Sequence, residues 1–451
     1  MADALKIGIA GLGTVGASLV RIIQQKSNEL AVTCGRPITI TAVSARDKRR
    51  DRGIDLSAVT WFDRPEDLAE KGDIDVFVEL MGGAEGAANT SVRAALKRGL
   101  HVVTANKALL AYHGVELATI AEEKGALLNF EAAVAGGIPV IKALRESLTG
   151  NAVSRIYGIM NGTCNYILTK MEKEGLSFAE CLKEAQRLGY AEADPAFDIE
   201  GNDTAHKLSI LTTLAFGNRI AADDIYLEGI TNISIEDIHA AAELGYRIKL
   251  LGVAQRTDTG IEQRVHPTMV PVDSVIAQVD GVTNAVAIES DVLGELLMVG
   301  PGAGGNATAS SVLGDIADIA KSQPGAQRVP VLGHPAKALE PYRKAQMQSH
   351  EGGYFIRLTV LDRTGVFASV ATRMAENNIS LESIVQRSKQ HLAPSHHQTI
   401  ILVTHATMEE SVRRAVASIK SEGYLFGEPQ VIRIERPKLD ILLDSPNQAM
   451  G

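Results

Sequence analysis

The sequence has few cysteines, no excess of basic residues and no long apolar run. Its three cysteines, Cys34, Cys164 and Cys181, are too few and too scattered for a disulfide framework or a zinc site. The formal net charge of −9 argues against a nucleic-acid or membrane-surface role, because both need basic patches. No apolar run approaches the length of a membrane span, and the first residues lack the features of a secretion signal. We therefore expect a cytoplasmic protein that binds neither nucleic acid nor membrane.

The chain has 451 residues, a length that predicts two to four domains. Of its residues 45% are hydrophobic and 22% charged, a composition typical of a globular protein. The first 140 residues alternate strand and helix signals. Strands are expected at Leu5 to Ala10, Ile38 to Val43, Ile74 to Leu80, Val102 to Ala105 and Leu127 to Phe130, with helices at Thr14 to Gln25, Thr90 to Lys97 and Gly114 to Lys124. This alternation predicts an α/β fold, with a Rossmann-type doubly wound parallel sheet at the N-terminus.

The pattern changes after about residue 138. Helical stretches, the first expected from Gly137 to Leu148, come with several strand-like runs. Strands in the second half of this region follow one another without helices, which predicts an α+β domain with a mixed or antiparallel sheet. The last part has the strand and helix order βαββαβ of a ferredoxin-like domain. The domains expected are a dinucleotide-binding domain (1–137 plus 303–322), a substrate, catalytic and dimerisation domain (138–302), a linker (323–350) and a ferredoxin-like domain (351–436).

A glycine-rich motif directly follows the first strand and opens a helix. It consists of Gly11, Leu12, Gly13, Thr14, Val15 and Gly16. The first glycine permits a tight turn, the second lets the backbone approach a pyrophosphate, and the third lets helix and strand pack closely. We predict a nicotinamide cofactor site here, the alternative being a glycine-rich turn without a ligand.

The choice of cofactor depends on the end of the second strand. NAD selection usually needs an acidic side chain there, but this strand leads into Arg46, with Lys48 behind it. A guanidinium group suits a 2′-phosphate, so the sequence favours NADP over NAD. The basic residues from Lys48 to Arg52 are otherwise expected to be a solvated loop.

A helix expected from Gly201 to Leu214 places Asp203 and Lys207 in its apolar stripe, while Ser209 and the threonines that follow take the other side. Burying charge costs several kcal/mol per ion, so such residues are usually paired or functional. The alternative is a structural ion pair. Glu192 and Asp198, just upstream on a loop, favour a site.

Several motifs occur in an order that resembles homoserine dehydrogenases with a C-terminal ACT domain. They are the GLGTVG motif, Thr104-Ala-Asn-Lys107-Ala-Leu-Leu, Asn161-Gly-Thr-Cys-Asn-Tyr, Gly189-Tyr-Ala-Glu192-Ala-Asp-Pro, Gly201-Asn-Asp203-Thr-Ala-His-Lys207-Leu and the Gly300–Ser310 loop. The resemblance covers nearly the whole chain. It implies interconversion of L-homoserine and L-aspartate 4-semialdehyde with a nicotinamide cofactor, on the route to threonine, isoleucine and methionine.

The resemblance also implies roles for individual residues. Lys207 would be the proton donor and acceptor, Glu192 and Asp203 would hold the amino acid, and Lys107 would lie beside nicotinamide and substrate. Lys107 would lower the pKa of such a lysine and Asp203 would raise it, and the sequence does not decide between them. Asp198 is either a direct or a supporting carboxylate. Gly189, Gly302 and Gly304 are expected to approach the cofactor with their backbones.

A loop after the last strand of the first domain resembles the family's monovalent-cation site. Its ligands would be the Glu131 carboxylate and the carbonyl groups of Val134, Gly136 and Ile138, a hard oxygen set suited to Na+ or K+. The loop Asp362 to Gly365 resembles the ligand loop of ACT domains. This implies threonine as a feedback effector and a homodimer or homotetramer, the alternative being an ACT domain that only assembles subunits.

Two rival functions follow from other features. An aldehyde dehydrogenase would need an activated cysteine, and Cys164 is the only candidate, without an evident histidine partner. His206 is expected near the polar side of its helix and not to be catalytic. A non-catalytic amino-acid sensor would use the ACT domain alone, and the intact Glu192, Asp203 and Lys207 set argues against it.

Overall fold

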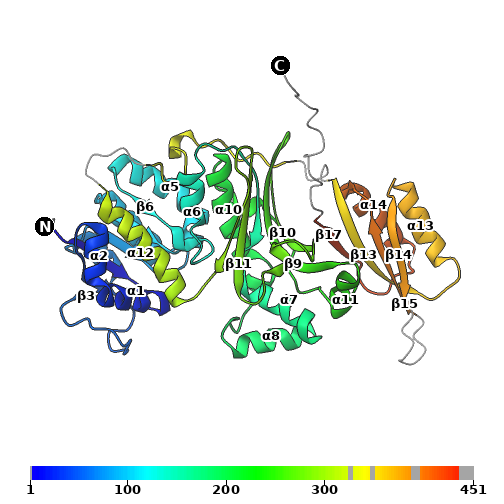
Figure 1. Cartoon of the computed structure of the whole chain (residues 1–451), viewed down its shortest axis with the longest axis horizontal. Coiled ribbons are helices and arrows are strands. Elements are labelled where there is room, and N and C mark those ends of the chain that lie inside the picture. Colours follow the sequence, from blue (N-terminus) through cyan, green and yellow to red (C-terminus); the bar gives the residue numbers. More distant parts are fainter. Residues whose placement is uncertain (1–2, 323–328, 346–350, 388–396, 436–451) are drawn as a thin grey trace, which may run out of the picture.

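The computed structural model describes residues 3–322, 329–345, 351–387 and 397–435, and Figure 1 shows them in three regions along one axis. A parallel sheet with its helices lies at one end, a mixed sheet lies in the middle, and the ferredoxin-like region lies at the other end. Within the part of the chain described, every helix is too short or too polar to span a lipid bilayer.

The first sheet has six parallel strands in the order β3-β2-β1-β4-β5-β6, which confirms the predicted doubly wound fold. The strands are β1 (Leu5–Ala10), β2 (Ile38–Ser44), β3 (Thr60–Phe62), β4 (Val76–Glu79), β5 (His101–Thr104) and β6 (Leu128–Asn129). The helices are α1 (Thr14–Gln25), α2 (Ser27–Cys34), α3 (Pro65–Lys71), α4 (Ala87–Lys97) and α5 (Lys107–Lys124). The strand order reverses between β1 and β4, so ligands are expected at the carboxyl ends of these two strands.

Some elements differ from those predicted. The sequence patterns missed α2, α3 and β3, and α5 begins at Lys107 rather than at Gly114 because Asn106 caps it by accepting a hydrogen bond from the Leu109 amide. The helix predicted from Gly137 to Leu148 is instead a short α6 (Val140–Lys142) continued by a π-helical segment, Ala143–Ser147. Lys107 therefore lies in the first turn of a helix that directly follows β5.

The second sheet begins with five strands in the order β12-β11-β7-β9-β10. They are β7 (Val153–Ile159), β9 (Tyr246–Thr257), β10 (Gly260–Pro271), β11 (Thr283–Ser290) and β12 (Gly294–Pro301), and each pairs antiparallel with its neighbour. The short β8 (Tyr226–Leu227) adds to β10 in parallel. The helices of this region are α7 (Gly162–Glu174), α8 (Phe178–Arg187), α9 (Ala196–Ile199), α10 (Asn202–Phe216) and α11 (Ile235–Glu243).

Helix α10 carries Asp203 and Lys207 and has almost no solvent-exposed side. Ser209, Thr212 and Thr213 are fully buried, so the expectation of a polar face opposite the apolar stripe is wrong. Their hydroxyl groups donate hydrogen bonds to carbonyl groups of the same helix, which satisfies them without water. Contacts with α5 on one side and with the sheet on the other cover the whole helix.

The βαββαβ prediction for the last region is confirmed. Its elements are β13 (Glu351–Leu361), α13 (Val366–Glu376), β14 (Leu381–Arg387), β15 (His397–Thr404), β16 (Thr407–Met408), α14 (Glu409–Ser421) and β17 (Gln430–Ile434). Strand β17 pairs in parallel with β10, so this sheet continues the middle one into a single 11-stranded sheet. The two regions are therefore joined by backbone hydrogen bonding as well as by side chains.

Two further segments connect the regions. Helix α12 (Gly305–Lys321), which follows β12, packs against α1 through Val312, Ile316 and Ile319. The described part of the expected linker, 329–345, runs along the middle region: the Glu340 amide donates to the Gly217 carbonyl and the Ala345 amide to the Ile261 carbonyl. After the first passage from β6 to β7, the chain therefore returns to the parallel sheet at α12 and then passes to the middle region again.

Candidate active site

A cleft of about 1140 Å³ lies where the carboxyl ends of β1, β4 and β5 face the N-terminal ends of α7 and α10. Eleven predicted site residues line it: Thr14, Val15, Lys107, Gly136, Gly189, Glu192, Asp198, Asp203, Lys207, Gly302 and Gly304. The other predicted residues do not: Gly11, Leu12, Gly13, Gly16, Arg46, Glu131, Val134 and Ile138. The cleft thus brings residues of the glycine motif together with both lysines and three carboxylates from the middle region.

Asp203 lies between the two lysines. Its Oδ2 accepts a hydrogen bond from Lys207 Nζ at 2.7 Å, and its Oδ1 lies 3.0 Å from Lys107 Nζ. Lys207 Nζ also donates to the Met160 carbonyl at 2.7 Å. The Lys207 side chain is 11% exposed and that of Lys107 34%, whereas that of Asp203 is 7% exposed. Both ammonium groups and the carboxylate between them line the cleft.

The neighbouring charges in this cluster shift the pKa values of Asp203 and Lys107 toward their charged forms. Burial alone would raise the pKa of Asp203, but Lys207 and Lys107 together hold it well below its usual range. Asp203 in turn raises the pKa of Lys107, against the opposing effect of burial. At neutral pH the cleft therefore contains an ionised Asp203 and a protonated Lys107.

Asn161 belongs to this cluster, although it was not among the predicted site residues. It caps α7, accepting from the Cys164 amide, and its Nδ2 donates to Asp203 Oδ2 and to Asp198 Oδ1, both at 2.9 Å. The sequence signal was an asparagine between a strand and a helix, but an N-cap does not reveal which carboxylates its amide group will meet. Asn161 links the two acids of the cleft.

Asp198 and Glu192 differ in their surroundings. Asp198 lies in α9, not in a loop, and also accepts a weak hydrogen bond from Thr163 Oγ1 at 3.3 Å. Burial, and then the nearby charge of Asp203, raise the pKa of Asp198. Glu192 is exposed at the cleft and forms no ion pair within the described ranges. Of the two acids, Glu192 is the one with its carboxylate available to a ligand.

The glycine motif has the geometry that a dinucleotide loop requires. Gly11 has a φ of +104°, and a Cβ there would lie 2.5 Å from the Leu80 carbonyl oxygen. A Cβ at Gly16 would lie 2.1 Å from the Gly11 carbonyl oxygen, so helix and loop are in contact. At Gly305, at the start of α12, a Cβ would lie 2.8 Å from Ser18 Oγ and 2.9 Å from Thr14 Cγ2. Two loops that are far apart in sequence therefore meet at the start of α1.

Basic residues after β2 take two different positions. Arg46 is exposed at the end of β2 and does not line the cleft. Arg52 is partly buried, and its Nε donates to the Leu12 carbonyl at 3.0 Å. The expectation that Arg52 belongs to a solvated loop is therefore wrong, because its guanidinium group holds that loop against the glycine motif.

The predicted cation loop is built around Glu131. Its two carboxylate oxygens accept the amides of Ile141 and Lys142, each at 2.8 Å. Burial raises the pKa of Glu131 despite these bonds, and it raises the pKa of the adjacent Asp315 to about 8. The Gly136 carbonyl accepts from Ser311 Oγ. The loop therefore combines carbonyl oxygens with a buried acidic pair, which suits a cation, although among described residues no three His, Cys, Asp or Glu form a metal-binding cluster.

Two side chains relevant to the rival functions lie outside the cleft lining. Cys164 is fully buried, and burial raises its pKa well above that of a free thiol, which argues against a thiolate nucleophile. His206 is buried between the rings of Tyr112 and Phe197, not on a polar side, and burial lowers its pKa. Neither residue is placed for catalysis.

Comparison with known proteins agrees with this geometry. Family models match for the homoserine dehydrogenase NAD-binding domain at residues 11–131, for homoserine dehydrogenase at 139–317 and for the ACT domain at 354–423. A homoserine dehydrogenase of Neisseria gonorrhoeae is 43% identical over 433 residues, covering 96% of this chain and 98% of that protein.

Solved structures give the same result. A homoserine dehydrogenase from Thiobacillus denitrificans is 41% identical with a TM-score of 0.89, covering 96% of this chain and 98% of that one. A hyperthermophilic archaeal homoserine dehydrogenase is 30% identical with a TM-score of 0.60, covering 69% and 96%. The chain therefore belongs to the homoserine dehydrogenase family, with that family's NAD-binding domain and a C-terminal ACT domain.

Proposed function

We propose that this enzyme interconverts L-homoserine and L-aspartate 4-semialdehyde, with Lys207 as the general acid and base, in threonine, methionine and isoleucine biosynthesis. The observation that carries the proposal is Lys207 in the cleft that the glycine motif also lines, held by Asp203 and Met160. An ammonium group has three N–H donors, and these contacts use two. The third is then available to the substrate oxygen.

The proton and hydride move separately in this reaction. When homoserine is oxidised, the C4 hydride leaves the carbinol carbon and its hydroxyl proton passes to the Lys207 amine; in reduction the Lys207 ammonium protonates the developing alkoxide. A bound nicotinamide would supply the hydride acceptor or donor. Lys107, held as a cation by Asp203, adds positive charge where the alkoxide forms.

The substrate amino group needs a negative partner. Glu192 provides a carboxylate at the cleft without an ion pair in the described chain, and a charge-assisted hydrogen bond to the substrate ammonium follows. Asp198 already accepts from Asn161 and Thr163. We therefore assign Asp198 a supporting role and Glu192 and Asp203 the direct contacts with the amino acid.

The experiment that tests the proposal measures homoserine oxidation by the change in nicotinamide absorbance, with NADP+ and NAD+ in parallel assays. We propose NADP as the preferred cofactor because Arg46 is an exposed cation at the end of β2, where a 2′-phosphate would lie. The archaeal relative was solved in complex with NADPH. Arg46→Ala should raise the KM for NADP+ and leave that for NAD+ unchanged; an equal KM for both cofactors in the wild type would refute the preference.

Two regulatory elements complete the proposal. Glu131 with the Val134, Gly136 and Ile138 carbonyls would hold Na+ or K+, which would offset the buried acidic charge; turnover and melting temperature should then rise when K+ replaces a bulky organic cation. The loop before α13 ends in Gly365 at a φ of +91° and would bind threonine as a feedback inhibitor. Threonine that leaves turnover unchanged would favour an ACT domain that only assembles subunits.

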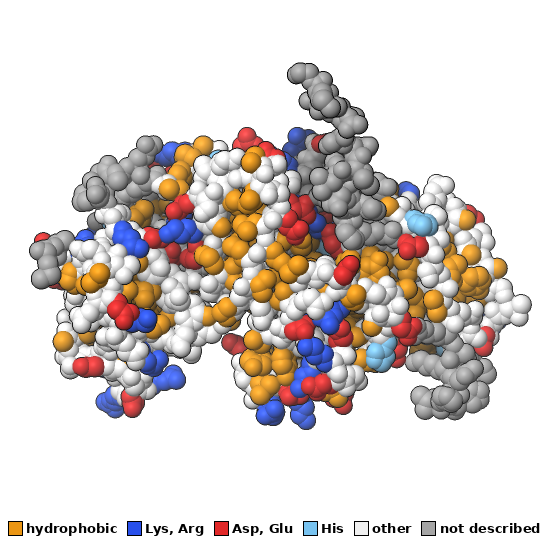
Figure 2. All heavy atoms as spheres, in the orientation of Figure 1, with side chains coloured by type: hydrophobic (Ala, Val, Ile, Leu, Met, Phe, Trp, Pro, Cys, Tyr) orange, Lys and Arg blue, Asp and Glu red, His pale blue; other side chains and the backbone are white. Residues whose placement is uncertain are grey.

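We also propose a homo-oligomer. Figure 2 shows hydrophobic side chains gathered over the middle of the molecule, where the mixed sheet lies in Figure 1. Exposed apolar residues of the β11–β12 hairpin and its surroundings include Val292, Leu293 and Val299. Apolar surface of this kind commonly marks a protein interface. Mass measurement in solution tests whether the enzyme is a dimer or a tetramer.

A further inference from the structure

One wall of the cleft is a turn that contains none of the proposed catalytic groups. The segment between β10 and β11 ends at Val282, and both Val282 and Thr283, the first residue of β11, line the cleft. It lies very close to the start of α7, because a Cβ at Gly162 would be 2.9 Å from the Val282 carbonyl oxygen. The position of this turn therefore sets the width of the cleft beside Asn161, which holds Asp198 and Asp203.

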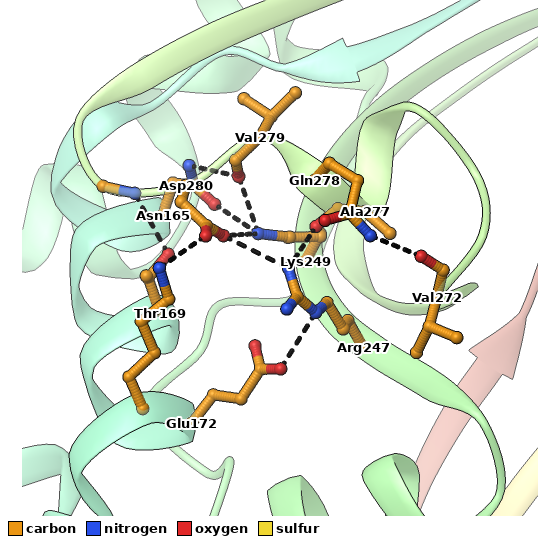
Figure 3. Close-up of polar contacts among 12 residues, drawn as sticks. Asn165, Thr169, Glu172, Arg247, Lys249, Val272, Ala277, Gln278, Val279 and Asp280 are labelled. Carbon is orange, nitrogen blue, oxygen red and sulfur yellow. Dashed lines mark hydrogen bonds and ion pairs between the residues drawn. The ribbon is translucent and has the colours of Figure 1, made fainter.

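A buried lysine lies behind the turn, as Figure 3 shows. Lys249 of β9 is 1% exposed, and its ammonium group donates to the Val279 carbonyl at 2.7 Å, to Asn165 Oδ1 at 3.3 Å and to Asp280 Oδ1 at 3.4 Å. All three of its N–H donors thus have acceptors. Two of those acceptors, Val279 and Asp280, belong to the turn.

Asn165 of α7 completes the connection. Its Nδ2 donates to the Val279 carbonyl at 3.0 Å and to the Thr283 carbonyl at 3.2 Å, while its Oδ1 accepts from Lys249. One asparagine side chain therefore holds both ends of the Val279–Thr283 turn against the helix whose N-cap is Asn161. Gly281 adds a third bond to the helix, from its amide to Thr169 Oγ1.

The burial of Lys249 has a cost that a purely apolar side chain would not have. Removing an ammonium group from water costs several kcal/mol, and burial accordingly lowers the pKa of Lys249 against the opposing charge of Asp280. Replacement of buried ionic groups by apolar residues is often neutral or stabilising. A fully satisfied polar cluster instead fixes one geometry, here that of the turn.

The turn is also connected, through backbone contacts, to the opposite side of the cleft. Thr283 is paired with Pro301, and the next residue, Asn284, lies directly beside Gly302. The backbone of Gly302 in turn contacts Gly136, because a Cβ at Gly136 would lie 2.4 Å from the Gly302 carbonyl oxygen. A displacement of Thr283 would therefore move the backbone that lines the cleft at Pro301 and Gly302.

We propose that Lys249 is a positioning residue for this enzyme: acting with Asn165, it fixes the Val279–Thr283 turn and thereby the substrate and cofactor walls of the cleft. The inference rests on the proposed homoserine oxidation, and it assigns Lys249 no contact with substrate, cofactor or reacting atoms.

The same strand offers a matched control. Arg247 is also a basic residue of β9 bonded to the same segment. It donates to the Ala277 carbonyl at 2.9 Å and shares with Lys249 a long contact to Asp280 Oδ1 at 3.4 Å, whereas the short bond to the Val279 carbonyl belongs to Lys249. The Arg247 Nε pairs with Glu172 at 2.9 Å (Figure 3). Loss of Arg247 should therefore loosen the outer part of the segment without moving the residues that line the cleft.

The experiment compares full-length Lys249→Met, Lys249→Gln, Asn165→Ala and Arg247→Met with the wild type. Melting temperature, steady-state kinetics with homoserine and NADPH affinity by its fluorescence are measured for each. Lys249→Met should raise the KM for homoserine and the Kd for NADPH roughly tenfold, with a smaller change in kcat, because the walls move while Lys207 stays. Lys249→Gln keeps a donor for the Val279 carbonyl and should recover most of this loss.

Arg247→Met should lower the melting temperature but change both constants by less than about twofold. Folded Lys249→Met with wild-type constants, or equal changes in Arg247→Met, would overturn the inference. If Lys249→Met does not fold, Asn165→Ala decides, because it removes the bond to Thr283 and should raise the same constants; unchanged constants there refute the idea. A wild type that does not oxidise homoserine would refute the proposed function, and NADPH affinity would still decide the role of Lys249.

Discussion

Two clusters in this enzyme have a buried carboxylate held between cations, in very different surroundings. In the cleft, Asp203 lies between Lys107 and Lys207. Between the mixed sheet and the ACT domain, Glu409 at the start of α14 pairs with Arg264 of β10, at 2.6 Å, and with Arg433 of β17. An exposed third cation, Arg413, pairs with the other carboxylate oxygen of Glu409. The first cluster faces the cleft, whereas Arg264 and Glu409 are almost fully buried.

The type of cation differs accordingly. A guanidinium group remains protonated in proteins and forms planar, multidentate contacts, whereas a lysine amine can release a proton. In the interdomain cluster the arginines also stack on an aromatic ring, since Arg413 and Arg433 lie 5.6 and 5.7 Å from the centre of the Tyr226 ring. Lysines at an accessible cleft are therefore suited to proton transfer, and arginines at a closed interface are suited to structural cohesion.

The largest expected effect separates the clusters by activity. Lys207→Met should lower kcat by roughly 10²–10⁴-fold, because it removes the group proposed to take and give the hydroxyl proton. Cofactor affinity, measured by NADPH fluorescence, should stay within about twofold of the wild type, since Lys207 contacts Asp203 and Met160 rather than the glycine motif. Turnover near the wild-type level would remove the distinction between the clusters.

The next effect concerns stability. Glu409→Gln removes the carboxylate that Arg264, Arg433 and Arg413 share, and leaves Arg264 with Glu262 as its acidic partner. The free energy of unfolding should fall by roughly 3–5 kcal/mol. The kcat of the folded variant should stay close to that of the wild type. Denaturant unfolding and steady-state kinetics measure the two quantities. A kcat loss without a loss of stability would mean that this cluster takes part in the reaction.

The dependence of the unfolding free energy on acid pH should report on the same carboxylate, Glu409. Burial alone would raise the pKa of Glu409, but Arg433 and Arg264 lower it to about 2. Because the pKa of Glu409 is lower in the folded state than in the unfolded state, where it is about 4.5, its ion pairs stabilise the fold fully above about pH 4.5. This stabilisation is lost as the pH falls toward 2. We expect unfolding free energy to fall between about pH 4.5 and 3 more steeply in the wild type than in Glu409→Gln. Parallel curves would count against the assignment.

The smallest expected effect comes from an exchange of cation type in the cluster around Glu409, and the same exchange in the cleft is its comparison. Arg264→Lys keeps a positive charge beside Glu409 but loses the planar donor set, and should cost about 1–2 kcal/mol of unfolding free energy. Lys207→Arg also keeps its charge, but it should lose activity nearly as fully as Lys207→Met, because a guanidinium group does not give up its proton. Equal tolerance of both exchanges would show that only charge matters at each cluster.

How much of this could be predicted from the sequence depended on the range of the interactions. The glycine motif, the doubly wound class of the first sheet and the buried pair Asp203 and Lys207 follow from local patterns. The structure brings Thr14 and Val15 of that motif to the same cleft as the pair. The polar residues of α10 were misplaced because helical periodicity reports only the apolar side. It does not reveal that a second layer, here α5, will cover the other side.

Long-range partners were beyond sequence reasoning. Lys249 has the appearance of an ordinary strand residue, and its partner Asn165 is 84 positions away. Arg52 looked like part of a solvated basic loop, but it bonds to Leu12, 40 positions earlier. Arg264 and Glu409 lie 145 positions apart in different regions. Such pairs are set by how the sheets join, and composition or spacing along one element carries no signal of that.

The most direct test of the central claim, that the Lys207 amine moves the substrate proton, is chemical rescue. Lys207→Ala is assayed with homoserine and cofactor at saturation while methylamine is added in increasing concentration. We predict that turnover rises with the amine concentration, and that Lys107→Ala shows no such rise because Lys107 contributes charge rather than proton transfer. Turnover of Lys207→Ala that stays high without amine, or rescue confined to Lys107→Ala, would contradict the account.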